Sequence, residues 1–131
     1  MRSSVILLSV AAVAAAACGS AVEAQPVIVY VSNQSFDIDP VDITVTVDGE
    51  VVVADDFRVE GQHNWVEFPL QLAGGEHVME VSSVRGPATY LGTLQVDGPL
   101  WVVVDYWSGS DTEDGAPAFG VHISTEPVGF M

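Results

Sequence analysis

The stretch that decides the fold is Asp42–Phe57, with the sequence DITVTVDGEVVVADDF. Ile43, Val45 and Val47 alternate with threonines, which is the period of two expected for a strand with one face in a core. Asp48-Gly49 then separates this run from a second run rich in β-branched residues. Asp-Gly between two such runs is among the strongest hairpin signals. The sequence therefore predicts a β-hairpin.

The register of this hairpin depends on the length of its loop. A strict two-residue loop pairs Val47 with Glu50, whereas one extra loop residue pairs Val47 with Val51. The longer loop keeps the apolar residues of both strands on the same face of the sheet. We therefore expect the longer loop.

Further short strands are predicted on both sides of the hairpin, each bounded by turn residues. They are Pro26–Ser32, Asn64–Leu72, His77–Val84, Ala88–Val96, Leu100–Trp107 and Ala118–Ser124. Pro69 cannot donate a backbone hydrogen bond, so Asn64–Leu72 is expected at a sheet edge or with a bulge. After residue 17 no segment has a helical period. The predicted fold class is all-β, a single antiparallel two-sheet β-sandwich of seven to eight strands.

The N-terminus carries the pattern of an export signal. Met1–Ala17 has one basic residue, Arg2, and then a run of Val, Ile, Leu and Ala. The next residue is Cys18, the sole cysteine, in the sequence AAACGS. This resembles the lipobox of bacterial lipoproteins, although Ala15 stands where leucine is usual. The resemblance implies that Cys18 is acylated and anchors the protein to a membrane.

The predicted domain organisation follows from this signal. Residues 1–17 form the export signal, 18–25 a polar tether and 26–131 the β-sandwich domain. The alternative is an ordinary secretory signal cut later, for example after Ala24. Both readings place the domain outside the cytoplasm, either bound to a bacterial membrane as a lipoprotein or secreted. A sole cysteine also excludes an internal disulfide.

The charge balance is strongly acidic. The chain has 18 Asp and Glu against three Lys and Arg, a formal charge of −15. All 18 acidic residues lie after Cys18, together with only two arginines, so that part carries −16. Such a surface repels phosphate backbones, and we expect no nucleic-acid partner.

Two segments together resemble a known group of envelope domains. Val45-Thr46-Val47-Asp48-Gly49 and the segment from Leu72 to Val81, LAGGEHVMEV, follow a VxVDG…LxxGxHxxxV pattern. This pattern is similar to that of PEGA-type and related immunoglobulin- or transthyretin-like domains. The glycines and valines of the pattern imply a fold and no activity.

The candidate ligand site lies on the predicted strand Leu100–Trp107. If its even-numbered residues face the core, then Trp101, Asp105 and Trp107 share the outer face with Val103. Indoles beside a carboxylate suit the apolar faces of sugar rings or the anchoring side chain of a protein partner. A glycan or an envelope protein is therefore the expected ligand. The alternative is a strand buried on both sides.

An acidic loop offers a weaker candidate for a metal site. Asp111, Glu113 and Asp114 precede Gly115, and alternating carboxylates on a flexible loop can supply several oxygens to Ca²⁺. The spacing differs from that of an EF-hand, and a solvated loop is the alternative. A second acidic run covers Asp37–Asp42. His63, His77 and His122 have no local spacing of metal ligands.

No catalytic motif is present: the sequence lacks GxSxG, HExxH and a Gly-rich phosphate loop. We therefore predict no enzymatic activity and no required cofactor. Ca²⁺ is the one ion for which the sequence offers a candidate site. The sequence favours a binding or structural module of the bacterial envelope. The alternatives are a carbohydrate-binding module that uses the Trp101 and Trp107 face, and a Ca²⁺-dependent adhesin-like domain.

Overall fold

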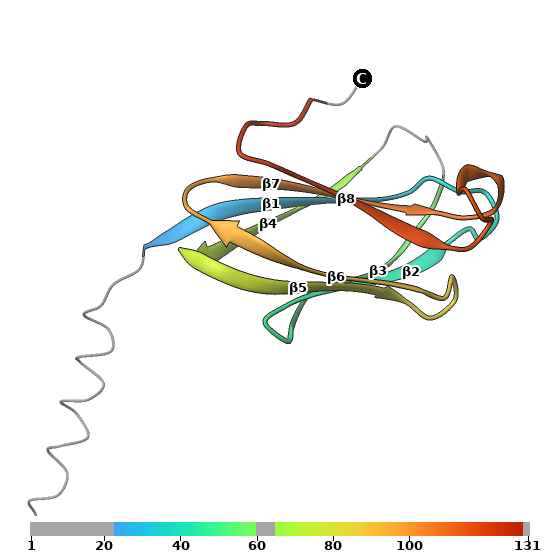
Figure 1. Cartoon of the computed structure of the whole chain (residues 1–131), viewed down its shortest axis with the longest axis horizontal. Coiled ribbons are helices and arrows are strands. Elements are labelled where there is room, and N and C mark those ends of the chain that lie inside the picture. Colours follow the sequence, from blue (N-terminus) through green and yellow to red (C-terminus); the bar gives the residue numbers. More distant parts are fainter. Residues whose placement is uncertain (1–22, 60–64, 130–131) are drawn as a thin grey trace, which may run out of the picture.

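The computed structural model describes residues 23–59 and 65–129. In these residues, strands β1 to β8 form two four-stranded sheets packed face to face (Figure 1). The first sheet has the order β4 (Val66–Ala73), β1 (Ala24–Asn33), β7 (Leu100–Trp107) and β8 (Ala118–Ser124). The second has the order β3 (Glu50–Phe57), β2 (Val41–Val47), β5 (Gly75–Ser83) and β6 (Ala88–Val96). The predicted two-sheet β-sandwich is confirmed.

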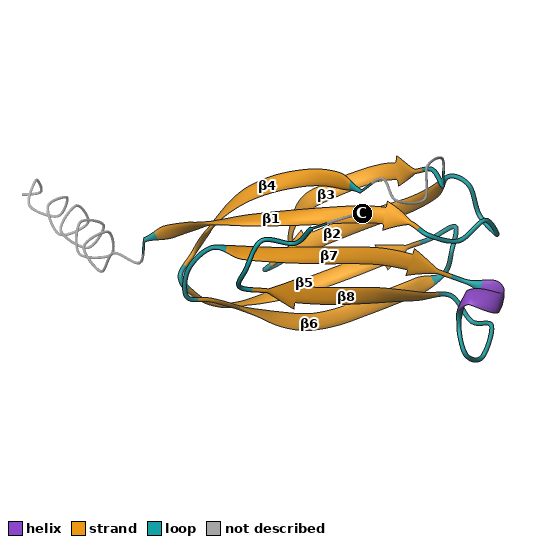
Figure 2. Ribbon diagram, turned by 90° about the horizontal axis from the view of Figure 1, so that it is seen from above, coloured by secondary structure: helices purple, strands orange, loops and turns teal. Residues whose placement is uncertain are grey.

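One strand pair departs from the predicted antiparallel arrangement. The central strands β1 and β7 run parallel, with Val27 beside Leu100 and Asn33 beside Tyr106. Figure 2 shows both strands ending at the same end of the sandwich. A parallel pair needs a long connection, and here most of the chain lies between the two strands. The remaining pairings are antiparallel.

Strand positions follow the sequence pattern closely. The last three strands have the predicted bounds. Strand β4 lies at a sheet edge, as Pro69 requires. Strand β1 starts at Ala24, so the last two residues of the predicted tether, Ala24 and Gln25, belong to this strand.

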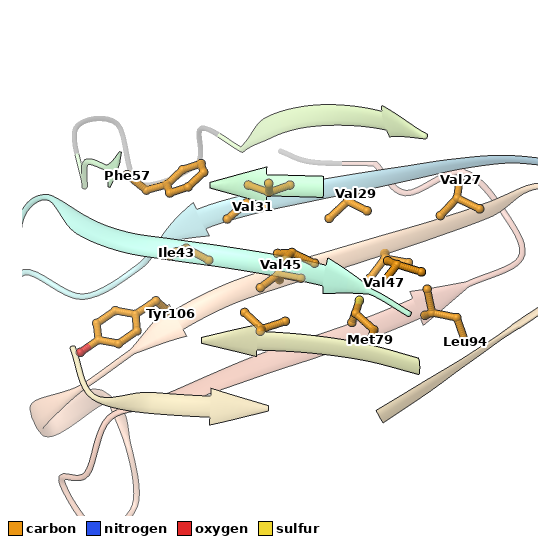
Figure 3. Close-up of a cluster of buried hydrophobic side chains, with 14 of the residues drawn as sticks. Val27, Val29, Val31, Ile43, Val45, Val47, Phe57, Met79, Leu94 and Tyr106 are labelled. Carbon is orange, nitrogen blue, oxygen red and sulfur yellow. The ribbon is translucent and has the colours of Figure 1, made fainter. Parts of the chain in front are cut away.

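The core consists of inward-facing apolar side chains from both sheets, mostly valines (Figure 3). Strand β2 alternates strictly, and its residues Val41, Ile43, Val45 and Val47 are at most 4% exposed. The opposite sheet contributes inward residues of β1 and β7, with Tyr106 fully buried. This alternation places every second residue of β7 on the outside of the first sheet.

The hairpin register differs from the expected one. Val47 pairs with Glu50 across a two-residue turn in which Asp48 has φ 51° and Gly49 has φ 83°. Both positive φ values are those of a type I′ turn, whose twist suits a hairpin. The prediction that Val47 pairs with Val51 is therefore wrong. A bulge restores the apolar match instead, since Thr46 pairs with Val51 and Val45 with Val53.

A carboxylate fastens this turn to the neighbouring strand. Asp48 accepts a hydrogen bond from the backbone N–H of Val78 at 2.8 Å, and its other oxygen lies 2.6 Å from Nδ1 of His77. Nε2 of the same ring lies 2.6 Å from the carbonyl oxygen of Ala73. A carbonyl and a carboxylate both accept hydrogen bonds, so this arrangement favours the imidazolium form of His77, in which both ring nitrogens donate. The contact ties the β2–β3 turn to the β4–β5 turn.

This contact makes stability depend on pH. The Ala73 carbonyl and the Asp48 carboxylate raise the pKa of His77 above its ordinary 6.5. A raised histidine pKa gives stability that is complete below 6.5 and is lost as the pH rises through the folded-state pKa. The Val78 N–H and His77 lower the pKa of Asp48 below its ordinary 3.8, so its contribution is lost only in stronger acid.

We predict that the free energy of unfolding of the wild type falls as the pH rises above 6.5, and that His77→Gln removes this part of the fall. Denaturant titrations at a series of pH values measure the difference. His122→Gln, which replaces an exposed histidine of β8, is the matched control for the substitution, and the effect of His77→Gln is measured relative to it. Identical pH profiles for the wild type and His77→Gln would contradict the assignment.

Candidate functional site

The outer face of the first sheet carries the aromatic strip predicted on β7. Leu100, Val102, Val104 and Tyr106 face the core, whereas Trp101, Asp105 and Trp107 face outward and are half-buried. The predicted division of this strand is thus confirmed. Val103 also faces outward but is only 7% exposed.

Asp105 is the centre of a hydrogen-bonded group on this face. Its Oδ1 accepts a hydrogen bond from the indole Nε1–H of Trp65 at 2.6 Å and another from the hydroxyl of Ser32 at 2.7 Å. The side-chain amide of Gln34 in turn donates to the Ser32 hydroxyl at 2.9 Å. Among the described residues, both hydrogen bonds to this carboxylate end on Oδ1. The Oδ2 atom therefore keeps its capacity to accept a hydrogen bond.

Strand register explains why these residues meet. Ser32 of β1 and Gly120 of β8 are the direct neighbours of Asp105 in the sheet. Trp65 immediately precedes β4, whose first residue pairs with Val31. The indole of Trp65 thus reaches across strand β1 to the carboxylate of Asp105 on β7. Four segments distant in sequence supply the group.

The second indole lies on the other side of the carboxylate. A Cβ atom built on Gly120 would be 3.4 Å from Nε1 and 3.7 Å from Cδ1 of Trp107, so the Trp107 ring lies over this glycine. Because Gly120 is the sheet neighbour of Asp105, the carboxylate has Trp65 on one side and Trp107 on the other. Indole faces beside a carboxylate can bind an apolar ring face or a cation.

Trp101 is on the same face but belongs to the other end of β7. Trp101 precedes Asp105 by four residues, and its sheet neighbours are Ile28 and Ser124. At the rise of a strand, this places it about 13 Å from Asp105 and about 20 Å from Trp107. The predicted residues thus divide into a group at Asp105 and Trp107 and a separate indole at Trp101.

Sequence reasoning missed Trp65, Ser32, Gln34 and Gly120 as members of the site. Trp65 did carry a signal, because it shares the outward parity of Glu67 on β4. Ser32 and Gly120 carried none, since only the register of three strands brings them beside Asp105.

The acidic loop after β7 is held by its own hydrogen bonds. Gly109–Asp111 form a short 3₁₀ helix, and Asp114 accepts a hydrogen bond from the backbone N–H of Ala116 at 3.0 Å. Asp111 and Glu113 lie exposed on the same loop. Within residues 23–59 and 65–129, no three His, Cys, Asp or Glu side chains are arranged to hold a metal ion. Binding of Ca²⁺ at Asp111, Glu113 and Asp114 stays a prediction.

The other acidic run, Asp37–Asp42, covers the link between β1 and β2 and the start of β2. Asp39 accepts a hydrogen bond from the backbone N–H of Val59 at 3.1 Å, and Asp37 lies against Gly109. Asp42 accepts hydrogen bonds from the Ser83 hydroxyl and from the backbone N–H groups of Val84 and Arg85 in the β5–β6 turn. Burial acts to raise the pKa of Asp42, but these hydrogen bonds outweigh it and lower that pKa. Asp39 and Asp42 thus cap backbone N–H groups of neighbouring loops and turns.

The predicted export signal, Cys18 and His63 lie outside the described residues. His122 stands on the outer face of β8 beside Val103, and His77 belongs to the turn contact. In the described part of the chain, no helix is long and apolar enough to cross a membrane.

Comparisons with protein-family models, with curated proteins and with solved structures each find no match.

Gly120 offers a direct test of where the Trp107 ring lies. We predict that Gly120→Ala is tolerated, because its Cβ makes ordinary contact, and that Gly120→Val displaces the ring. The measurement is the indole N–H cross-peak of Trp107 in an ¹⁵N–¹H spectrum, which should move in the valine variant and stay close to its position in the alanine variant. The Trp101 cross-peak is the internal control. An unmoved Trp107 cross-peak in Gly120→Val would show that the ring lies elsewhere.

Proposed function

We propose that this chain is a non-catalytic binding module of the bacterial envelope, held at a membrane by lipid on Cys18. Its binding surface is the outer face of the β4–β1–β7–β8 sheet at Asp105. One observation carries the proposal: a carboxylate oriented by two donors lies between two half-buried indoles on an outward face. Ordered aromatic rings with a polar partner are typical of binding surfaces.

The position of the site relative to the anchor supports this function. Cys18 precedes the start of β1 at Ala24 by six residues, a span of at most about 20 Å. Strands β1 and β7 both run away from Ala24, and Asp105 pairs with Ser32 near the far end of β1 (Figure 2). A membrane-anchored domain would thus present Asp105 and Trp107 away from the membrane.

A carbohydrate ligand is the second candidate, and the spacing of the indoles favours it. Trp101 and Trp107 lie about 20 Å apart along one strand. An extended glycan could contact both indoles with its ring faces and Asp105 with a hydroxyl group. If the export signal is instead cut after Ala24, the same surface would belong to a secreted protein.

The test uses Cys18→Ser protein, so that lipid no longer retains it, mixed with envelope material from the cells that make it. We predict that Trp107→Ala lowers the amount that sediments with this material about tenfold, the effect of losing an indole at the centre of an interface. Leu91→Ala is the matched control, because Leu91 is 71% exposed on the other sheet. Circular dichroism confirms folding of each variant. Equal sedimentation of the Trp107→Ala and Leu91→Ala proteins would contradict the proposed surface.

A further inference from the structure

We infer that the site between Trp65 and Trp107 takes the guanidinium group of an arginine side chain presented by a partner protein. The inference rests on the proposed binding function and names the chemistry that its surface recognises. Its basis is the charge of Asp105, the indoles beside it and the position of the group on the outer face of a sheet.

The charge of Asp105 is not balanced within the described part of the chain. The ion pairs found there join His77 to Asp48 and Arg85 to Asp56. The groups that donate to Asp105, an indole N–H and a hydroxyl, are neutral. They orient the carboxylate and leave its negative charge in place. The chain as a whole, at −15, further favours a cation.

The Trp107 indole, beside the carboxylate that Trp65 orients, strengthens the preference for a cation of a particular shape. An indole is the best aromatic partner for a cation, because its π face is electron-rich. The planar guanidinium group stacks on such a face while its N–H fork reaches a carboxylate oxygen, here Oδ2 of Asp105. A lysine ammonium is compact and strongly hydrated and matches this arrangement less well. A neutral sugar would gain a charge-assisted hydrogen bond from a hydroxyl group to Oδ2 but no attraction between opposite charges.

The shape of the surface favours a side chain presented by a macromolecule. Small molecules bind in concave sites that enclose most of their surface. Hollows of about 240 to 530 Å³ occur at the sandwich ends and edges in the described part of the chain. One of them reaches Ser32, whose hydroxyl donates to Asp105, but Trp65, Asp105 and Trp107 are not among the residues that line these hollows. A sheet face of this kind suits one anchoring side chain, with neighbouring residues of the partner covering the rest.

The experiment titrates the purified full-length protein with acetyl-Gly-Arg-Gly-amide and follows the indole N–H cross-peaks of Trp65 and Trp107. The control peptide replaces arginine with citrulline, which has the same shape and no charge. We predict that the citrulline peptide binds about tenfold more weakly, as expected when a charge-assisted contact is lost. Equal affinity for the two peptides would overturn the inference.

Two variants separate a local site from general attraction to an acidic protein. Asp105→Asn keeps the oxygen that accepts from Trp65 and Ser32, so it should fold, and we predict that it binds the arginine peptide about tenfold more weakly. Asp97→Asn removes the same charge from the turn after β6 and should change the affinity less than about twofold. Equal losses in both variants would overturn the inference.

Failure of this inference is distinguishable from failure of the proposed function. If Trp107→Ala abolishes sedimentation with envelope material but the two peptides bind alike, the surface is a binding site for another ligand and the arginine assignment is wrong. If Trp107→Ala sediments normally, the proposed function itself is wrong. A glycan that shifts the Trp101 and Trp107 cross-peaks, where the arginine peptide shifts neither, would replace arginine by carbohydrate.

Discussion

Carboxylates held by hydrogen-bond donors organise this sandwich, because the chain has almost no cations to hold them. With 18 acidic residues against three Lys and Arg, most carboxylates have no basic side chain to pair with. Asp42 instead accepts backbone N–H groups from the β5–β6 turn, and Asp48 accepts one from strand β5 and contacts the His77 ring. These contacts fix the turns at two ends of the second sheet, while burial of its valines supplies the main driving force.

Asp105 differs from these turn caps in its surroundings. Its donors are side chains from β1 and from the residue before β4, and they lie on an outward face with an indole on each side. This arrangement joins side chains of β1, β7 and the residue before β4, whereas the turn caps hold backbone donors. The same contacts that order Trp65 leave Oδ2 and the negative charge for a ligand. This is why the proposed surface and the proposed arginine both centre on Asp105.

The sequence predicts the strands and their faces but not how they are assembled. Alternation of large apolar residues located β2 and β7 and identified which side of β7 faces out. Three consecutive valines, Val51–Val53, concealed the bulge, because any of them could face the core. The parallel pairing of β1 with β7 leaves no local signal, so the contact between Ser32 and Asp105 was not predictable. Trp107 and Asp105 were predicted as site residues only because the alternation of β7 places both on its outer face.

The most direct test of this account is the indole N–H of Trp65 in an ¹⁵N–¹H spectrum of the wild type and of Asp105→Ala. The hydrogen bond of 2.6 Å to Asp105 predicts slow exchange of this proton with solvent in the wild type. In Asp105→Ala the cross-peak should move and the exchange should become faster, while the Trp101 indole stays unchanged. A Trp65 indole proton that exchanges equally fast in both proteins would contradict the central role of Asp105.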